Sequence, residues 1–221
     1  MSSQQEIKRR RTFAIISHPD AGKTTITEKL ILLGNLIQVA GSVKGKKTEK
    51  HATSDWMAME QQRGISVTSS VMQFKYHGRV VNLLDTPGHA DFGAEVERVM
   101  KMVDGVLLVV DSHDGPQAQT KFVLRKAMEN GLKPIVVINK IDRKDARIQE
   151  VLNAVYDLFI DLDATESQLE FPVIYANARA GLAAQLRQQR AGIRLAQQVR
   201  FRDHHHVGAG ELILEQFRQR R

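Results

Sequence analysis

Alternation between short apolar runs and helix-like segments constrains the fold of this 221-residue chain more than any other feature of its sequence. Five short runs are rich in β-branched residues and apolar at almost every position: residues 12–16, 80–84, 105–110, 135–138 and 173–175. Such runs are typical of strands that are buried on both faces of a parallel sheet. Residues 65–76 form a longer run that mixes Ser and Thr with apolar residues, which indicates a strand nearer an edge.

Four segments between these runs have apolar residues at helical spacing: residues 24–33, 93–102, 116–130 and 146–158. Gly131 directly follows the third segment, where a glycine commonly ends a helix. The alternation predicts a doubly wound α/β fold in three layers, with helices on both faces of a mostly parallel sheet of about six strands. Ligands of such sheets bind beyond the carboxyl ends of the strands, so the loops after the strands are the candidate site.

The composition narrows the class of protein further. A hydrophobic share of 42% and a charged share of 26% are typical of a soluble globular protein. The chain has no cysteine, which excludes a disulfide scaffold, thiolate metal sites and thiol catalysis. No apolar run approaches the roughly 18 residues of a membrane span, and the run after the basic cluster of residues 8–11 is too short for a signal peptide. A cytoplasmic location is therefore expected.

The positive charge is unevenly distributed along the chain. The net charge is +7, and residues 182–221 carry eight Arg against three acidic residues, whereas the last Lys of the chain is Lys144. We therefore expect a basic N-terminal arm (1–10), a globular domain (11–181) and an Arg/Gln-rich tail (182–221), with residues 182–199 compatible with a closing helix before a disordered end. An excess of this size suggests a polyanionic partner, but it is also common on ordinary protein surfaces.

The loop after the first expected strand reads Ser-His-Pro-Asp-Ala-Gly-Lys-Thr-Thr from Ser17 to Thr25, a P-loop in which Ser17 replaces the usual first Gly. Backbone N–H groups at a helix N-terminus can cradle phosphate, and Gly22 lets the backbone approach closely. Lys23 can reach the β- and γ-phosphates, and the Thr24 hydroxyl can ligate Mg²⁺. The residues predicted to bind the phosphates are Asp20, Ala21, Gly22, Lys23, Thr24 and Thr25. Taken alone, an incidental strand–turn–helix is the alternative.

The loop after the strand expected at residues 80–84 begins Asp-Thr-Pro-Gly-His. Asp85, at the end of that strand, can hold Mg²⁺ through its water shell, and Gly88 offers a backbone N–H to the γ-phosphate. The same residues also suit an ordinary turn. Their position after Lys23, with one further strand between, favours the nucleotide site.

The loop after the strand expected at residues 135–138 reads Asn139-Lys140-Ile141-Asp142 and indicates the base. The Asp142 carboxylate can accept hydrogen bonds from two donors on guanine that adenine lacks, and an unpaired buried acceptor allows discrimination by about 10⁴–10⁵. Asn139 can bond the base and tie this loop to the P-loop, and the Lys140 stem can cover the ring. A surface turn is the alternative, and the presence of all three motifs in order favours GTP over ATP.

These motifs together resemble the G domain of the translational GTPases, the family of elongation factors Tu and G, over about residues 10–181. Residues 10–74, with the segments 54–57 and 62–66, are similar to the class II peptide-chain release-factor GTPase. Residues 81–176, with the segments 85–91, 131–143 and 162–165, are similar to the TypA/BipA ribosome-associated GTPase. The resemblance implies a P-loop NTPase fold and a ribosome-linked switch that hydrolyses GTP to GDP and phosphate.

The resemblance also implies roles for individual residues. Ser66 would ligate Mg²⁺ beside Thr24 and Asp85, at the end of a mobile switch segment over residues 34–64. His89, with Lys23, would be catalytic, because in the family this histidine positions the attacking water. Asn177 and Ala178 stand where the family has Ser-Ala, and the Ala178 N–H would bond the guanine O6. Asp20 would lie near a monovalent cation.

The implied cofactors are GTP/GDP and Mg²⁺, and the implied partner is the ribosome. The protein is expected to be a monomer, and no DNA or membrane partner is expected. Both similar families continue into β-barrel domains, and no β-barrel domain is expected in this chain. A second function therefore stays open: a truncated G-domain binding module that holds GTP/GDP or ribosomal RNA without productive turnover.

Overall fold

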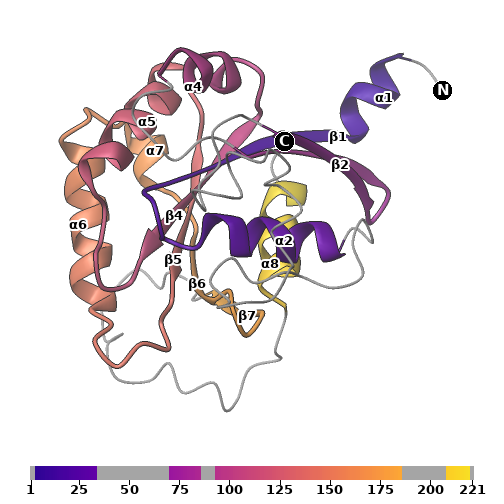
Figure 1. Ribbon diagram of the computed structural model, residues 1–221. Helices are drawn as coiled ribbons and strands as arrows, with labels where there is room; N and C mark the ends of the chain where they lie inside the picture. The colour runs from indigo at the N-terminus through magenta and orange to yellow at the C-terminus, as the bar shows by residue number, and fades with distance from the viewer. Residues whose placement is uncertain (1–2, 34–69, 86–92, 186–207, 220–221) are drawn as a thin grey trace.

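The computed structural model describes residues 3–33, 70–85, 93–185 and 208–219. Within this part of the chain, a seven-stranded sheet lies between two layers of helices (Figure 1). The strands are β1 (Arg10–Ser17), β2 (Ser70–Tyr76), β3 (Arg79–Asp85), β4 (Gly105–Asp111), β5 (Pro134–Asn139), β6 (Val173–Asn177) and β7 (Leu182–Gln185). The helices are α1 (Ser3–Arg9), α2 (Lys23–Leu33), α4 (Gly93–Met100), α5 (Ala118–Glu129), α6 (Ile148–Ile160), α7 (Glu166–Leu169) and α8 (Ala209–Gln219).

The sheet has the order β2-β3-β1-β4-β5-β6-β7. Neighbouring strands are parallel except at the two edges, where β2 pairs antiparallel with β3 and β7 pairs antiparallel with β6. The predicted doubly wound α/β fold is thus confirmed, including the edge position of the strand that mixes Ser and Thr with apolar residues. The predicted helix end is confirmed as well, since Gly131 follows α5 with a φ of +70°.

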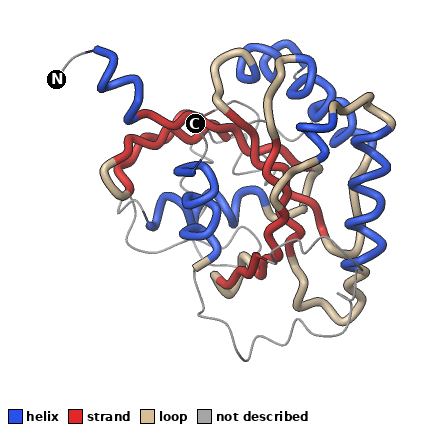
Figure 2. The backbone as a smooth tube through the Cα atoms, turned by 180° about the vertical axis from the view of Figure 1, so that it is seen from behind, coloured by secondary structure: helices blue, strands red, loops and turns tan. Residues whose placement is uncertain are grey.

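The hydrophobic core lies on both faces of the sheet, because successive side chains of a strand point to opposite faces. In β1, Ala14 and Ile16 face α4, α5 and α6, whereas Phe13 and Ile15 face α2 and α8. Figure 2 shows the two groups of helices from behind, on either side of the strands. Every residue of β4 is buried, as expected for a central strand of a parallel sheet.

The chain after Gly181 differs from the prediction. Instead of starting a helix over residues 182–199, residues 182–185 form β7, because the turn at Gly181 (φ +75°) brings them back along β6 and their backbone pairs with its open edge. Residues 186–199 lie outside the described part of the chain. The expected disorder at the end of the tail does not hold for α8, which packs on the sheet.

Close packing against Phe13 and α2 helps to hold α8 against the domain. The Phe217 ring stacks on that of Phe13 with 4.0 Å between the centroids. Gly210 lies against α2, where an added Cβ would be 2.4 Å from Leu33 Cδ1. Helix α8 therefore fills the place of the closing helix, although the change in composition sets it apart from the domain.

Residues 3–9 of the N-terminal arm form helix α1, which the sequence pattern did not predict, while Arg10 and Arg11 begin β1. Glu6 pairs with Arg9 at 3.6 Å and with Arg10 at 3.8 Å, on one side of this helix. Figure 1 shows α1 extending from the start of β1, away from the sheet and the other helices. Among the described residues, no helix has the length and apolar character that crossing a membrane requires.

Candidate functional site

The candidate site lies where the carboxyl ends of the parallel strands meet. The strand register places Asp85 beside Ile15, Asp111 beside Asn139, and Asn139 beside Ala176. The loops after β1, β3, β4, β5 and β6 therefore begin at one edge of the sheet. Sequence motifs that are far apart along the chain thus emerge side by side.

The P-loop connects β1 to α2 with two residues in the left-handed region. Asp20 has a φ of +64° and Gly22 a φ of +99°. Lys23 begins α2 and its side chain is buried, while Thr24 and Thr25 follow in the first turn and are partly buried. The first backbone N–H groups of a helix have no partner within the helix, so this turn presents donors and a partial positive charge to an anion. The arrangement suits a phosphate chain.

Asn139 joins three of the loops through one buried amide. Its Nδ2 donates to the Ala21 carbonyl at 2.9 Å, and its Oδ1 accepts from the Ala178 N–H at 3.0 Å. A Cβ on Gly22 would lie 2.2 Å from Asn139 Nδ2. Gly22 is therefore needed for the approach of Asn139, a second reason for a glycine at this position besides the predicted approach of a phosphate. The tie between this loop and the P-loop, which the sequence suggested, is present in the structure.

In the loop after β6, Asn177 stands where the family has a serine, and its side chain stabilises the loop through a hydrogen bond of its own. Asn177 Oδ1 accepts the N–H of Ala180 at 3.0 Å, which closes a tight turn. The Ala178 N–H, predicted to bond the guanine O6, is occupied by Asn139 in this structure. A guanine O6 would have to share that N–H with Asn139 or displace it.

Lys140 and Asp142 lie at the rim of the same edge. Lys140 has a φ of +63° and its side chain is about one-third exposed, while Asp142 is exposed. An exposed carboxylate at this place is free of the desolvation that burial would impose, and it can accept the two donors of a guanine edge. The exposure of Asp142 leaves the predicted base-reading role sterically open.

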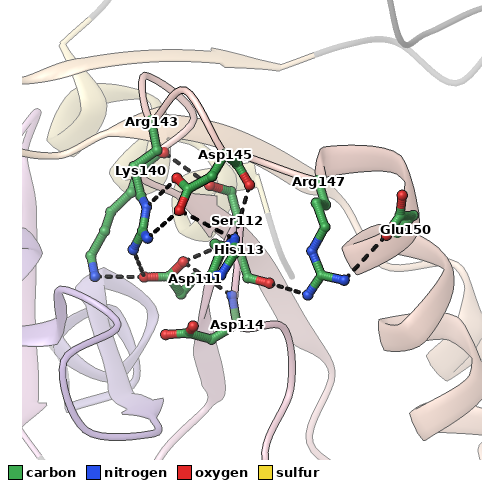
Figure 3. A network of polar contacts seen from close by, with 9 residues as sticks. All are labelled: Asp111, Ser112, His113, Asp114, Lys140, Arg143, Asp145, Arg147 and Glu150. Carbon is green, nitrogen blue, oxygen red and sulfur yellow. Dashed lines mark hydrogen bonds and ion pairs between the residues drawn. The ribbon is translucent and has the colours of Figure 1, made fainter.

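Asp111 belongs to the site although the sequence analysis did not single it out. Its side chain is fully buried at the end of β4, and Oδ2 accepts from Lys140 Nζ at 2.5 Å. Its Oδ1 accepts the N–H of His113 at 2.8 Å and that of Asp114 at 3.3 Å (Figure 3). Burial pushes the pKa of the Asp111 carboxyl up, but these hydrogen bonds and the Lys140 charge outweigh it and leave the pKa below its usual value. In the sequence, Asp111 could have been recognised as a candidate site residue because it is the one carboxylate in an otherwise apolar strand and stands at its carboxyl end.

A second ion pair lies within the loop after β5, and further hydrogen bonds join this loop to the loop after β4. Arg143 Nε and Nη2 bond the two carboxylate oxygens of Asp145 at 2.8 and 2.7 Å, and this hydrogen bonding lowers the pKa of Asp145 to about 2. Ser112 Oγ donates to the Lys140 carbonyl at 2.9 Å, and Arg147 Nη2 donates to the His113 carbonyl at 2.5 Å. The loops after β4 and β5 are therefore held to each other at several points (Figure 3).

His18, in the P-loop, is buried with both ring nitrogens lacking a hydrogen-bond partner among the described residues. Burial lowers the pKa of His18 below its ordinary value of 6.5, and the nearby charges of Asp111 and Asp114 oppose this without cancelling it. The imidazole is therefore neutral near pH 7. Ser17, beside it, donates from Oγ to the His18 carbonyl at 2.8 Å.

The remaining predicted residues are described in part or not at all. Asp85 ends β3 next to β1, but its side chain lies outside the description, as do Ser66, Gly88, His89 and residues 34–64. Among the described residues no three His, Asp or Glu side chains come together to hold a metal. Thr24, one of the residues predicted to ligate Mg²⁺, lies in the first turn of α2 and is partly buried.

Comparison with known proteins gives relatives of one kind. Residues 8–213 match the family model of the elongation factor Tu GTP binding domain. The large ribosomal subunit assembly factor BipA of Salmonella typhimurium is 50% identical over 177 residues, which is 80% of this chain and 28% of that protein. BipA of Bacillus subtilis is 50% identical over 174 residues, 79% of this chain and 28% of its own. The chain thus spans about 28% of the length of these curated relatives.

Solved structures have the same fold. A protein from Thermus thermophilus superposes with a TM-score of 0.60 at 28% identity, over 70% of this chain and 22% of that one. Translation elongation factor SelB from Methanococcus maripaludis, solved with the GTP analogue GppNHp, has a TM-score of 0.58 at 22% identity, over 77% of this chain and 30% of its own.

Proposed function

The chain belongs to the family of the elongation factor Tu GTP binding domain, and from that premise we propose that it binds guanine nucleotides and hydrolyses GTP to GDP and phosphate as a ribosome-linked switch. All the residues proposed to contact the nucleotide lie within residues 11–181, the predicted GTP-binding domain. The arm of residues 1–10 and the segment 182–221 contribute none of them.

The observation that carries this proposal is the position of Asn139. Its amide bonds the P-loop at Ala21 and the last loop at Ala178, so one buried side chain sets the spacing between the phosphate cradle and the base-reading loop. A nucleoside diphosphate has a phosphate end and a base end at a fixed separation. A protein that links the two subsites rigidly is preorganised for it and loses less entropy on binding.

Each proposed binding residue has a chemical task. The N–H groups from Asp20 to Thr25 hold the phosphate oxygens, and the Lys23 ammonium neutralises the β- and γ-phosphates. Asp142 accepts from the guanine edge and the Lys140 stem covers the ring. Mg²⁺, when bound, would neutralise phosphate charge, and Thr24, Ser66 and Asp85 are the residues proposed to hold it.

Hydrolysis is proposed to depend on His89. Phosphoryl transfer requires positioning of the water and stabilisation of charge more than covalent chemistry from the protein. His89 would orient the attacking water, and the Gly88 N–H would contact the γ-phosphate. No arginine finger is evident in the sequence, so we propose slow intrinsic turnover and activation in trans.

The proposed partner is the ribosome. The relatives at about 50% identity are by name large ribosomal subunit assembly factors, and this resemblance supports a role on the same particle. We further propose that the protein is a cytoplasmic monomer that binds neither DNA nor membranes.

A nucleotide titration followed by a hydrolysis assay tests the proposal. Fluorescent mant-GDP should bind the full chain, and mant-ADP should bind about 10–100-fold more weakly, because adenine lacks the donors that Asp142 accepts and a hydrogen bond to a charged group is worth about 1.5–3 kcal/mol. Single-turnover GTP hydrolysis should then accelerate when 70S ribosomes are added. Equal binding of the two nucleotides would overturn the proposal. GDP binding without any ribosome stimulation would instead identify a module that holds nucleotide without turnover.

A further inference from the structure

An ionised carboxylate at the buried end of β4 needs an explanation, because an uncompensated charge in a protein interior is strongly unfavourable. Asp111 has no exposed surface and lies beside Asn139 in the strand register. A neutral residue would suit the end of this apolar strand better on packing grounds alone. The charge therefore has to be accounted for by its partners.

The two carboxylate oxygens of Asp111 have different partners. Oδ1 is held by the backbone N–H groups of His113 and Asp114, which fix the orientation of the carboxylate. Oδ2 faces two cations, Lys140 Nζ at 2.5 Å and Arg143 Nη1 at 3.7 Å. Because the Arg143 guanidinium already makes two bonds to Asp145, Lys140 is the main partner of Oδ2.

Lys140 is consequently held at both ends. Its carbonyl accepts the Ser112 hydroxyl at 2.9 Å, and its ammonium is bonded to Asp111 at the end of the neighbouring strand. The aliphatic stem between these points is extended toward Asp111, as Figure 3 shows. A free lysine side chain has many rotamers, and ordering it on ligand binding would reduce affinity.

We propose that Asp111 is a positioning residue that holds the stem of Lys140 in place as the cover of the bound guanine ring. This inference rests on the proposed function, since it concerns the same nucleotide site. Asp111 itself does not touch the nucleotide. Its effect passes through Lys140, and it is independent of the base edge that Asp142 reads.

Because Lys140 covers the face of the base and Asp142 reads its edge, a positioning role of Asp111 can be distinguished from a role in stabilising the whole loop. The Lys140 stem covers the face of any purine, so loss of its contact with Asp111 should weaken the binding of GDP and of IDP by the same factor. IDP lacks the 2-amino group of guanine, so the ratio of GDP to IDP affinity reports on edge reading. A loop that merely loosened would disturb the edge contacts too, and that ratio would change.

The experiment is an equilibrium titration of the full chain with mant-GDP and mant-IDP. Asp111→Asn keeps the side-chain shape and removes the charge that holds Nζ, and we expect about tenfold weaker binding of both nucleotides, which corresponds to about 1.4 kcal/mol. Asp114→Asn is the matched control, because it removes an exposed carboxylate from the same loop. Its affinities should stay within about twofold of the parent.

A double-mutant cycle tests the contact from its other side. Lys140→Met retains an aliphatic stem without the ammonium, so Asp111→Asn should add no further loss in that background. Additive losses, or a changed ratio of GDP to IDP affinity, would overturn the inference. If Asp111→Asn proves unstable in a thermal melt, Lys140→Met alone decides, and parental affinity would refute the role of the anchor. A parent chain that binds neither nucleotide would contradict the proposed function instead.

Discussion

Replacing Gly22 by alanine tests whether Asn139 links the P-loop to the base-reading loop. An alanine at a φ of +99° is strained, at a cost of about 1–2 kcal/mol. Its Cβ would also lie 2.2 Å from Asn139 Nδ2, which is closer than any non-bonded contact allows. Asn139 would have to withdraw from Ala21 and Ala178, and losing two buried hydrogen bonds costs about 2–3 kcal/mol. The expected loss in the free energy of unfolding is about 3–5 kcal/mol.

Gly78 provides the matched control for this prediction. It also has a positive φ, +76°, but a Cβ there would meet nothing within 4 Å. Gly78→Ala should therefore show the backbone strain alone, about 1–2 kcal/mol. Urea unfolding followed by far-UV circular dichroism measures both variants under the same conditions. Equal losses for Gly22→Ala and Gly78→Ala would refute the steric reasoning.

The same link can be examined in a variant that removes the clash. Asn139→Ala takes away the atom that the new Cβ would meet, so Gly22→Ala should be less destabilising in that background than in the parent. The expected coupling between the two positions is about 1–3 kcal/mol. Strictly additive effects would mean that Gly22 and Asn139 act independently.

The remaining predictions concern hydrolysis, core packing and pH. His89→Ala should leave GTP binding unchanged and abolish ribosome-stimulated hydrolysis, and equal stimulated rates in the variant and the parent would remove His89 from the mechanism. Phe217→Ala should lower the free energy of unfolding by about 3–5 kcal/mol, because it empties the space against Phe13 beneath α8; a loss below about 1 kcal/mol in urea unfolding would show that α8 contributes little. In the folded protein the pKa of His18 lies below its ordinary value of 6.5 because the ring is buried. As the pH decreases from about 7 to 5, the unfolded chain therefore takes up a proton at His18 before the folded protein does, and the free energy of unfolding should fall. In His18→Gln this fall should be shallower, and an unchanged slope in urea unfolding at several pH values would contradict the assignment.

The pattern along the chain was sufficient to predict most of the fold. The β-branched runs that became β1, β3, β4, β5 and β6 are short and apolar at almost every position, and such a local pattern is a property of the residues themselves. The three loop motifs were likewise visible, because each is defined by neighbours in sequence. Their convergence also followed from the sequence, since parallel strands place their carboxyl ends at one edge.

Strand β7 and helix α8 were not predicted, and the reason is physical. Residues 182–185 have no strand alternation of their own, and they are extended because the edge of β6 offers unpaired backbone groups. Helix α8 follows a change in composition that suggested a separate tail. Whether such a segment packs depends on the shape of the surface it meets, here α2 and Phe13, and that shape exists only after folding.

The sequence by itself determined which chemical groups this protein has and on which loops they lie, because strand periodicity and loop motifs are local. Apart from the tie of Asn139 to the P-loop, only the tertiary structure decided which of those groups touch. Asp111 and Lys140 are 29 positions apart, and Asn139 and Ala178 are 39 apart. Such contacts depend on strand register and on the path of the loops, which no local pattern encodes. The nucleotide motifs were therefore readable in advance, while the side chains that hold them together, Asn139 and Asp111, acquired their partners in the fold.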